Sequence, residues 1–249
     1  MPVFLLSDNI NFPPPHFARK DGLLAIGGDL SRERLLLAYQ KGIFPWYSNG
    51  EPILWWSPDP RLVLYPEELR VSRSLKKTIR KDCFQITMDQ AFFKVIKSCA
   101  ETRLNKKQPT WIVPEMIKAY CQLHESGFAH SVEVWDQGKL AGGLYGLAVG
   151  KCFSGESMFT HVTDASKVAF VYLVIFLKYL GFDMIDCQVK TSHLMSFGAR
   201  EIPRKIFLKQ LEKTLDLSQT RGKWNLNVDL IRELILEDSC RQYRKDEYL

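Results

Sequence analysis

The fold is decided by three consecutive runs of sequence: HSVEVW (130–135), KLAGGLYGLAV (139–149) and KCFSGESMF (151–159). They follow the period of two that is typical of β-strands. The connections between them are short and contain glycine: DQG at 136–138, and a pair that includes Gly150. Such connections favour hairpins. The pattern therefore predicts a three-stranded antiparallel meander.

A long apolar helix is predicted directly after the meander, from about Asp164 to Leu180, and Gly181 ends it. A short strand, Met184–Val189, follows. Because strand, helix and strand form a crossover unit, the two strands should be parallel. A meander, a helix and a parallel strand are the core order of the GCN5-related acyltransferase fold. We therefore expect an α+β protein with a mixed sheet.

The first 60 residues differ in composition from the rest, because they hold eight of the twelve prolines together with many Gly and Trp. One helix is clear there, with Ser31 as N-cap, a body over 32–41 and Gly42 after its end. We divide the chain into a small loop-rich N-terminal domain (1–60), a GCN5-like domain (61–226) and a C-terminal helical tail (227–249).

Further helices are predicted from caps and periodicity. Ser72 or Ser74 begins a short basic helix that runs to Lys81, and Asp89 caps a helix from Gln90 to about Glu101. Other helices are expected from Pro114 to Gly127, from Pro203 to Leu215, and in the tail, whose apolar face carries Val228, Ile231, Leu234 and Ile235.

The composition is that of a globular protein, with 46% hydrophobic and 25% charged residues among 249. The longest apolar stretch, 168–177, is about half of the roughly 20 residues that a membrane-spanning helix needs. The N-terminus has no signal-peptide pattern. The six cysteines include no CxxC pair, and the five histidines show no ligand spacing. We expect a cytoplasmic protein with free thiols and no metal.

Positive charge is concentrated in residues 61–110, which hold twelve Lys and Arg against five acids, whereas the whole chain has a net charge of +6. This excess suggests a face that binds a polyanion, although a solvated surface explains it equally well. Trp46 lies in a proline-rich loop and Trp111 just before a helix. Each could stack on a nucleic-acid base or pack in the core.

Three polar side chains interrupt predicted strands: Glu156 in FSGESMF, and Asp186 and Gln188 in MIDCQV. The spacing of two places Asp186 and Gln188 on one face, and Glu156 lies near them if the two strands are neighbours. Burying two carboxylates and an amide without partners is costly, which favours a polar active-site floor. The alternative is that they make structural hydrogen bonds or lie at strand ends.

The common cofactor loops are absent, since no GxGxxG, GxxxxGK[ST], HExxH or GxSxG motif occurs. The Gly-rich turn that binds the pyrophosphate of acetyl-CoA is missing too, and TDASK (163–167) stands in its place. If the fold is that of an acyltransferase, we expect a donor other than CoA and no cofactor.

Nine runs, in this order, closely resemble the leucyl/phenylalanyl-tRNA–protein transferase family over about residues 5–225. They are GLLAIGGDLS (22–31), YQKGIFPWY (39–47), ILWWSPDPR (53–61), TWI (110–112), HSVEVW (130–135), GGLYG (142–146), GESMF (155–159), ASK (165–167) and IDCQV (185–189). The resemblance implies a bacterial cytoplasmic aminoacyltransferase that uses neither CoA nor metal. It takes Leu or Phe, and Met less well, from Leu-tRNA or Phe-tRNA. It attaches the amino acid to the N-terminal amine of proteins that begin with Arg or Lys, which marks them for degradation. We expect a monomer that binds no membrane.

The resemblance also implies site residues. Glu156 falls where the incoming Arg or Lys N-terminus binds, while Asp186 and Gln188 form a proposed proton relay. Trp46 and Trp111 lie near the 3′-terminal adenosine. The tRNA acceptor stem meets the basic residues Arg73, Lys76, Lys77 and Arg80. The pocket for the Leu or Phe side chain includes Leu144, Phe153, Met158, Leu173, Leu177 and Ile185.

Because an amide is a poor base, we expect Gln188 to orient the amine by accepting a hydrogen bond, and Asp186 to stabilise the developing charge. Relatives can carry Met or Phe where Leu144, Leu173 and Leu177 stand, which leaves the Leu/Phe preference open. Two other classes also stay open. A CoA-dependent acetyltransferase would bind a CoA matrix, and an RNA-binding module without catalysis would tolerate Asp186→Ala.

Overall fold

The computed structural model describes residues 3–105, 110–215, 222–225 and 227–246, without the side chains at 103–105 and 238–246. Lys106 and Lys107 of the basic segment, and residues 247–249 of the predicted tail, lie outside the described residues. The described chain forms two sheets. One has the strand order β1-β2-β4-β3, and the other has the order β11-β5-β10-β9-β8-β7-β6.

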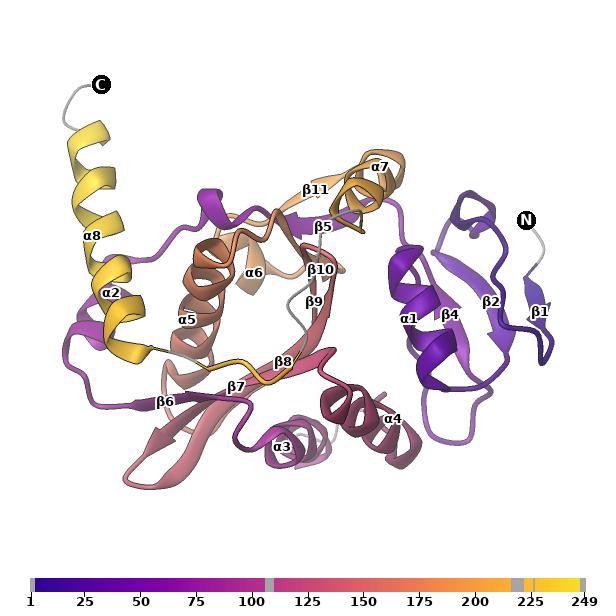
Figure 1. Cartoon of the computed structure of the whole chain (residues 1–249), viewed down its shortest axis with the longest axis horizontal. Coiled ribbons are helices and arrows are strands. Elements are labelled where there is room, and N and C mark those ends of the chain that lie inside the picture. The colour runs from indigo at the N-terminus through magenta and orange to yellow at the C-terminus, as the bar shows by residue number, and fades with distance from the viewer. Residues whose placement is uncertain (1–2, 106–109, 216–221, 226, 247–249) are drawn as a thin grey trace.

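The predicted meander and crossover form the centre of the larger sheet. The antiparallel strands β7 (Ala129–Asp136), β8 (Lys139–Val149) and β9 (Cys152–Thr160) are neighbours. Helix α5 (Ala165–Tyr179) then crosses the sheet, and β10 (Met184–Gln188) pairs in parallel with β9. The α+β class and the mixed sheet with GCN5-like order are confirmed (Figure 1).

Three short strands that we did not predict widen this sheet. They are β5 (Arg61–Leu64) and β11 (Arg200–Ile202) beside β10, and β6 (Gln85–Met88) beside β7. All four residues of β5 are buried. The strand therefore shows no alternation of apolar and polar side chains, and its sequence lacks the periodic signal.

The N-terminal segment is more regular than expected. It holds a sheet of β1 (Phe4–Leu6), β2 (Leu23–Gly27), β3 (Phe44–Pro45) and β4 (Leu54–Trp56), and helix α1 (Arg32–Gln40). The hydroxyl of Ser31 accepts from the Arg34 backbone N–H, so the predicted cap is confirmed. The division into domains stays a prediction.

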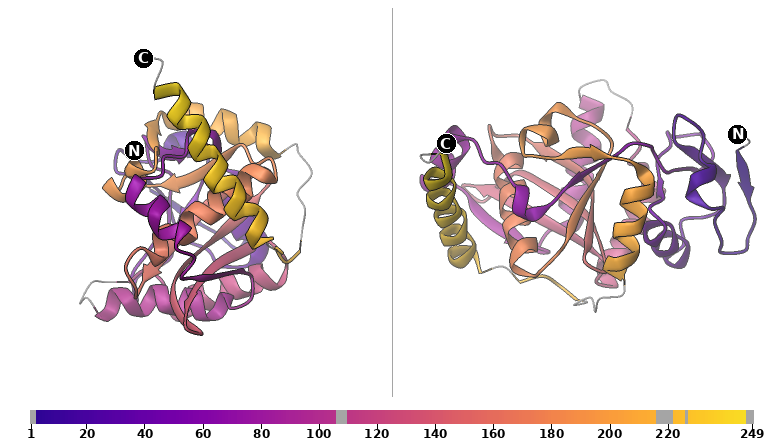
Figure 2. Two further views of the ribbon diagram at one scale, coloured as in Figure 1. Left: turned by 90° about the vertical axis from the view of Figure 1, so that its left-hand side faces the viewer. Right: turned by 90° about the horizontal axis from the view of Figure 1, so that it is seen from above.

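Helices cover both faces of the larger sheet (Figure 1). One face carries α5, α2 (Arg73–Arg80) and α8 (Val228–Asp246). The other carries α1, α3 (Phe92–Asn105), α4 (Pro114–Glu125) and α7 (Arg204–Leu215). The short α6 (Ser192–Ser196) follows β10, and single 3₁₀ turns occur at Pro15–Phe17 and Pro66–Glu68. The N-terminal sheet and α8 lie at opposite ends of the molecule (Figure 2).

The predicted cap at Asp89 is wrong. Asp89 has a φ of 56°, and its carboxylate contacts Nδ1 of His130 at 2.8 Å and accepts the backbone N–H groups of Ser131 and Trp224. The indole of Trp224 stacks on His130 with a centroid distance of 3.7 Å. Asp89 therefore ties the segment before α8 to the sheet instead of capping α3.

The predicted apolar face of the tail is confirmed for α8. Ile231 and Ile235 are buried against the core, and Val228 and Leu234 pack beside them. Within the residues that the structure describes, no helix has the length and apolar character needed to span a membrane.

Candidate active site

The site lies where the two parallel strands β9 and β10 separate. They pair from Cys152 to Ser154 and from Met184 to Asp186, and no further. Glu156 and Gln188 each follow the last paired residue by two positions. The separation opens a cavity of about 270 Å³, close to the lower end of the usual range for ligand pockets, about 300–1,000 Å³.

Glu156 stands at the centre of a hydrogen-bond network that spans the four elements α1, α4, β9 and β10. Its Oε1 accepts from the Tyr39 hydroxyl and from Nε2 of Gln188, both at 2.8 Å, and its Oε2 accepts from the Tyr120 hydroxyl at 3.2 Å. The two tyrosine hydroxyls also lie within hydrogen-bond distance of each other. Each has a single proton, so when one tyrosine donates to the other, only the second donates to Glu156. Because Gln188 donates through its nitrogen, its carbonyl oxygen remains an acceptor for an incoming amine.

Burial raises the pKa of Glu156 from 4.5 to about 7, and the charge of Asp186 contributes to the rise. The hydrogen bonds from Tyr39, Tyr120 and Gln188 act in the opposite direction. Burial, together with the charge of Glu156, holds the pKa of both tyrosines well above the usual value. The tyrosines are therefore neutral donors, and Glu156 changes charge near neutral pH.

Asp186 lies behind this network and does not line the cavity. Nε and Nη2 of Arg61 donate to its two oxygens at 2.8 and 2.7 Å, and both side chains are buried. Its Oδ1 also accepts the backbone N–H of Gln188 at 2.9 Å. The neighbouring strands bring Glu156 near Asp186 and Gln188, as expected. The prediction that Asp186 and Gln188 share one face is wrong, because the register shifts between them and only Gln188 lines the cavity. The ion pair with Arg61 was not foreseen.

The cavity is lined mainly by apolar side chains. Five of the six residues predicted for the donor side chain line it: Leu144, Phe153, Met158, Leu173 and Ile185. The sixth, Leu177, is fully buried within the core and is not part of the lining. It lies one helical turn beyond Leu173 on α5, where the packing between α5 and the sheet encloses it. Phe170, Cys187, His193 and Leu194 line the cavity as well and were not predicted.

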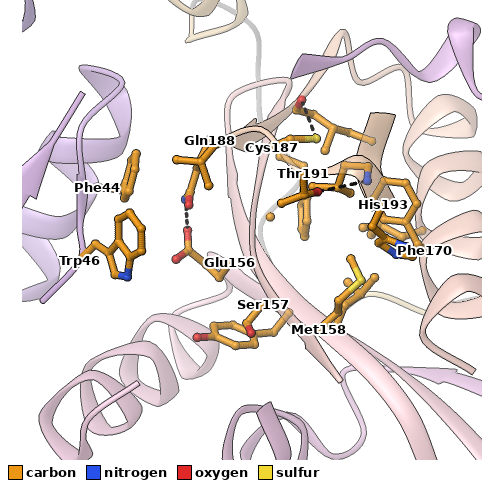
Figure 3. A pocket seen from close by; sticks show the side chains of 18 of the residues that line it. Phe44, Trp46, Glu156, Ser157, Met158, Phe170, Cys187, Gln188, Thr191 and His193 are labelled. Atoms are coloured by element: carbon orange, nitrogen blue, oxygen red, sulfur yellow. Dashed lines mark hydrogen bonds between the residues drawn. The ribbon is translucent and has the colours of Figure 1, made fainter. Parts of the chain in front are cut away.

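Trp46 and Trp111 both line the cavity but differ in exposure. Trp46 is 42% exposed and Trp111 is 9% exposed. Figure 3 shows Phe44 and Trp46 on one side of the Glu156–Gln188 pair, with Met158, Phe170 and His193 on the other. Phe44 and Trp46, which form the aromatic edge of the N-terminal segment, thus flank the polar pair on one side. The apolar side chains of the cavity flank it on the other.

The four predicted phosphate-binding residues lie on α2, and the Ser72 hydroxyl caps this helix by accepting the Leu75 backbone N–H. Arg73, Lys77 and Arg80 are exposed. Lys76 is only 8% exposed, because it lies on the buried face of this short helix together with Leu75 and Ile79. We therefore expect three of these residues, without Lys76, to reach a phosphate.

Tyr39, Tyr120 and Arg61 belong to this site but were not predicted from the sequence. Tyr39 and Arg61 do occur inside two of the quoted runs, YQKGIFPWY and ILWWSPDPR. Nothing local marks their function, because each is far in sequence from its partner: 117 residues separate Tyr39 from Glu156, and 125 separate Arg61 from Asp186.

The chain is similar in sequence to proteins of one known family. A family profile described as "Leucyl/phenylalanyl-tRNA protein transferase" matches residues 63–212, and the profile of its N-terminal domain matches residues 28–59. A leucyl/phenylalanyl-tRNA–protein transferase of Desulforapulum autotrophicum is 59% identical over 90% of this chain and 98% of its own length. One of Syntrophobacter fumaroxidans is 60% identical over 86% and 92%.

Solved structures resemble the chain only distantly. The protein L-PGS of Bacillus licheniformis has a TM-score of 0.39 and 12% identity, over 86% of this chain and 71% of that one. An aminoglycoside acetyltransferase from a soil metagenome has a TM-score of 0.37 and 11% identity, over 59% and 99%. The fold assignment therefore stands on the strand order, and the sequence matches decide the family. On these matches, the chain is a transferase that belongs to the leucyl/phenylalanyl-tRNA protein transferase family.

Proposed function

We propose that the protein transfers Leu or Phe, and Met less well, from aminoacyl-tRNA to the N-terminal amine of proteins that begin with Arg or Lys. The modified proteins would then be degraded. One observation carries the proposal beyond the family: an apolar cavity and an exposed tryptophan flank a carboxylate–amide pair. Such a site offers separate places for an amino-acid side chain, a nucleoside and a cationic acceptor.

The donor side chain enters the apolar part of the cavity, and the terminal adenosine stacks on Trp46 and Trp111. The acceptor's Arg or Lys side chain is a cation, which the Glu156 carboxylate favours by charge-assisted hydrogen bonding. The exposed cations of α2 meet phosphates of the tRNA without reading its sequence. These roles are extended to this chain through the family and the geometry around Glu156.

The reaction needs little chemistry from the protein because an aminoacyl ester is already activated. Holding the ester and the amine together provides most of the rate. In this mechanism the neutral amine donates a hydrogen bond to the carbonyl oxygen of Gln188. This contact orients the lone pair of the amine nitrogen toward the ester carbon. The amide bond forms as the ester bond breaks. The amine gives up one proton, and the 3′-terminal ribose oxygen takes up one proton and leaves as a hydroxyl. Asp186 supports the charge that develops on the amine.

A CoA donor is less compatible with the start of α5. Asp164 precedes this helix with a φ of 67°, and its carboxylate contacts Lys167 and Thr78. A pyrophosphate would meet this negative charge where CoA users offer glycine N–H groups.

The function is tested by incubating the protein with Leu-tRNA carrying labelled Leu and with a peptide that begins with Arg. Label should enter the peptide, and an N-acetylated copy of the peptide should stay unlabelled. The proposal fails if no label is transferred while the Leu-tRNA remains intact.

A further inference from the structure

Arg61 stands at the start of β5, behind the reacting groups. It is 1% exposed and does not line the cavity. Its Nε and Nη2 contact the two oxygens of Asp186 at 2.8 and 2.7 Å. This two-pronged arrangement matches the planar fork of arginine, which lysine cannot reproduce.

Asp186 in turn holds the backbone of Gln188. The Gln188 N–H donates to Oδ1 of Asp186 at 2.9 Å, and Gln188 has a φ of 61°. The pairing of β10 with β5 shifts register between these two residues. A non-glycine residue in this region of backbone space persists only where its surroundings hold it. Arg61 therefore influences the position of the Gln188 side chain indirectly, through Asp186.

Arg61 also touches the N-terminal part of the chain. Its guanidinium carbon lies 4.8 Å from the ring centroid of Phe44 and 4.7 Å from that of Phe207. Phe44 belongs to β3, and both Phe44 and the nearby Trp46 line the cavity. One side chain thus contacts the edge that carries Trp46 and the strand that carries Gln188.

A purely structural role explains this residue poorly. Its Nη1 is buried and has no hydrogen-bond partner among the described residues, an arrangement that costs free energy. Apolar residues of similar volume often replace a buried ion pair without loss of stability. The charged, two-pronged guanidinium group of Arg61 therefore indicates a role in the site.

We propose that Arg61 is a positioning residue for the transfer reaction. It holds Asp186, and through it the left-handed Gln188, and it fixes this strand against the Phe44–Trp46 edge. Donor and acceptor are thereby kept in one alignment. This inference rests on the proposed function, since it assigns Arg61 to that same reaction.

The test compares Arg61→Met, Arg61→Lys, Asp186→Asn and the double variant Arg61→Met/Asp186→Asn in the labelled-Leu assay. Arg61→Met should lower kcat by about 100-fold, the scale expected when a reacting group moves by about 1 Å. The KM of each substrate should change by less than about threefold, because neither substrate contacts Arg61. Arg61→Lys should recover part of the kcat.

The double variant decides how Arg61 acts. If it works through Asp186, the double variant should lose no more kcat than the more impaired single variant. Single-variant losses that multiply in the double variant would overturn the proposal. If Arg61→Met does not fold, Arg61→Lys carries the test, and a wild-type kcat in folded Arg61→Lys would overturn it.

Arg34 provides the matched control. It is also fully buried, and it donates to the backbone carbonyls of Ser7 and Asp8 and to the carboxylate of Asp29. Arg34→Met should lower Tm and leave the kcat of the folded protein unchanged; an equal kcat loss in this control would overturn the role. If the wild type transfers no Leu, the proposed function fails. If the wild type transfers Leu and folded Arg61→Met is equally fast, only the role of Arg61 fails.

Discussion

The hydroxyl of Tyr39 donates a hydrogen bond of 2.8 Å to Oε1 of Glu156. The bond joins helix α1 of the N-terminal segment to strand β9 of the larger sheet. It stabilises the ionised form of Glu156 and so opposes the rise in the pKa of this carboxyl that burial causes. The N-terminal segment thereby influences the charge of the candidate acceptor site.

Acceptor binding should depend on pH through Glu156. Because burial raises the pKa of Glu156 to about 7, the KM for an Arg-initiated peptide should fall as the pH rises through 7 and the carboxylate forms. Glu156→Gln should remove the part of this dependence that Glu156 causes, leaving that of the acceptor amine itself. It should also raise the acceptor KM far more than the KM for Phe-tRNA. Steady-state kinetics from pH 6 to 8 check both effects. An unchanged acceptor KM in the variant would refute the role of Glu156.

Tyr39→Phe should shift the same profile. The hydrogen bond from Tyr39 lowers the pKa of Glu156, so its loss should move the midpoint of the acceptor KM profile to higher pH. The same pH series on the variant measures this. A midpoint that stays in place or moves to lower pH would contradict the network.

Stability should depend on pH through the same residue. The pKa of Glu156 is higher in the folded state, about 7 against 4.5, so its stabilising contribution is present below pH 4.5 and is lost as the pH rises to about 7. The cost reaches roughly 3 kcal/mol above pH 7. The difference in free energy of unfolding between Glu156→Gln and the wild type should therefore favour the variant more at pH 8 than at pH 5. Urea titrations check this, with the exposed Glu212→Gln as control; equal gains at both pH values would count against it.

The donor pocket should distinguish two neighbouring leucines on α5. Leu173 lines the cavity, whereas Leu177 is buried behind it. Changing either to Ala should cost about 2–5 kcal/mol of stability. Only Leu173→Ala should also alter the ratio of kcat/KM for Leu-tRNA and Phe-tRNA. Both ratios are measured at a temperature where each variant is folded; a change confined to Leu177→Ala would place the pocket elsewhere.

Shape should also exclude some donors. Leu, Phe and Met are unbranched at Cβ, whereas Val and Ile are branched and stiff at χ1. In an apolar pocket, such differences are worth roughly 10–200-fold in kcat/KM. Val-tRNA and Leu-tRNA are compared in the labelled transfer assay, and equal rates would contradict a shaped pocket.

Helix α2 should contribute affinity without sequence preference. Replacing Arg73, Lys77 and Arg80 by Ala should weaken the binding of all tRNAs alike. It should also reduce the slope of log affinity against log salt by about one for each phosphate that is no longer neutralised. Replacing the exposed Lys205, Lys209 and Lys213 of α7 removes the same charge and should change the slope less. Filter binding at several salt concentrations compares the two. If the α2 and α7 substitutions change the slope equally, α2 contributes only general positive charge and no specific phosphate contacts.

The sequence predicts the centre of the fold and misses its periphery, for a physical reason. Strands β7 to β9 are 8, 11 and 9 residues long and are joined by short turns that contain glycine, so local rules identify them. Strand β5 has only four residues and β3 only two, so neither is long enough to show a period. Asp89 has the side chain of a helix cap, but its partners are Ser131 on β7 and Trp224 before α8, which are 42 and 135 residues away in sequence.

The residues of the candidate site likewise include some that the sequence predicts and some that it does not. Glu156 and Gln188 are visible in the sequence because polar side chains are conspicuous in apolar strands. Tyr39 and Tyr120 are not visible, because a buried tyrosine on a helix looks like ordinary core. Arg61 and Lys76 show the same error, because each is a cation that was expected at the surface and is buried. Arg61 is buried in an ion pair, and Lys76 is buried on its helix.

The most direct measurement is the mass and position of the adduct formed from Leu-tRNA and a peptide that begins with Arg and contains an internal Lys. The account predicts one added leucine residue on the N-terminal α-amine, located by fragmentation, and none on the Lys side chain. A companion peptide that begins with Glu should gain much less, because its carboxylate would face Glu156. Leucine on the internal Lys, or equal labelling of the two peptides, would contradict the account.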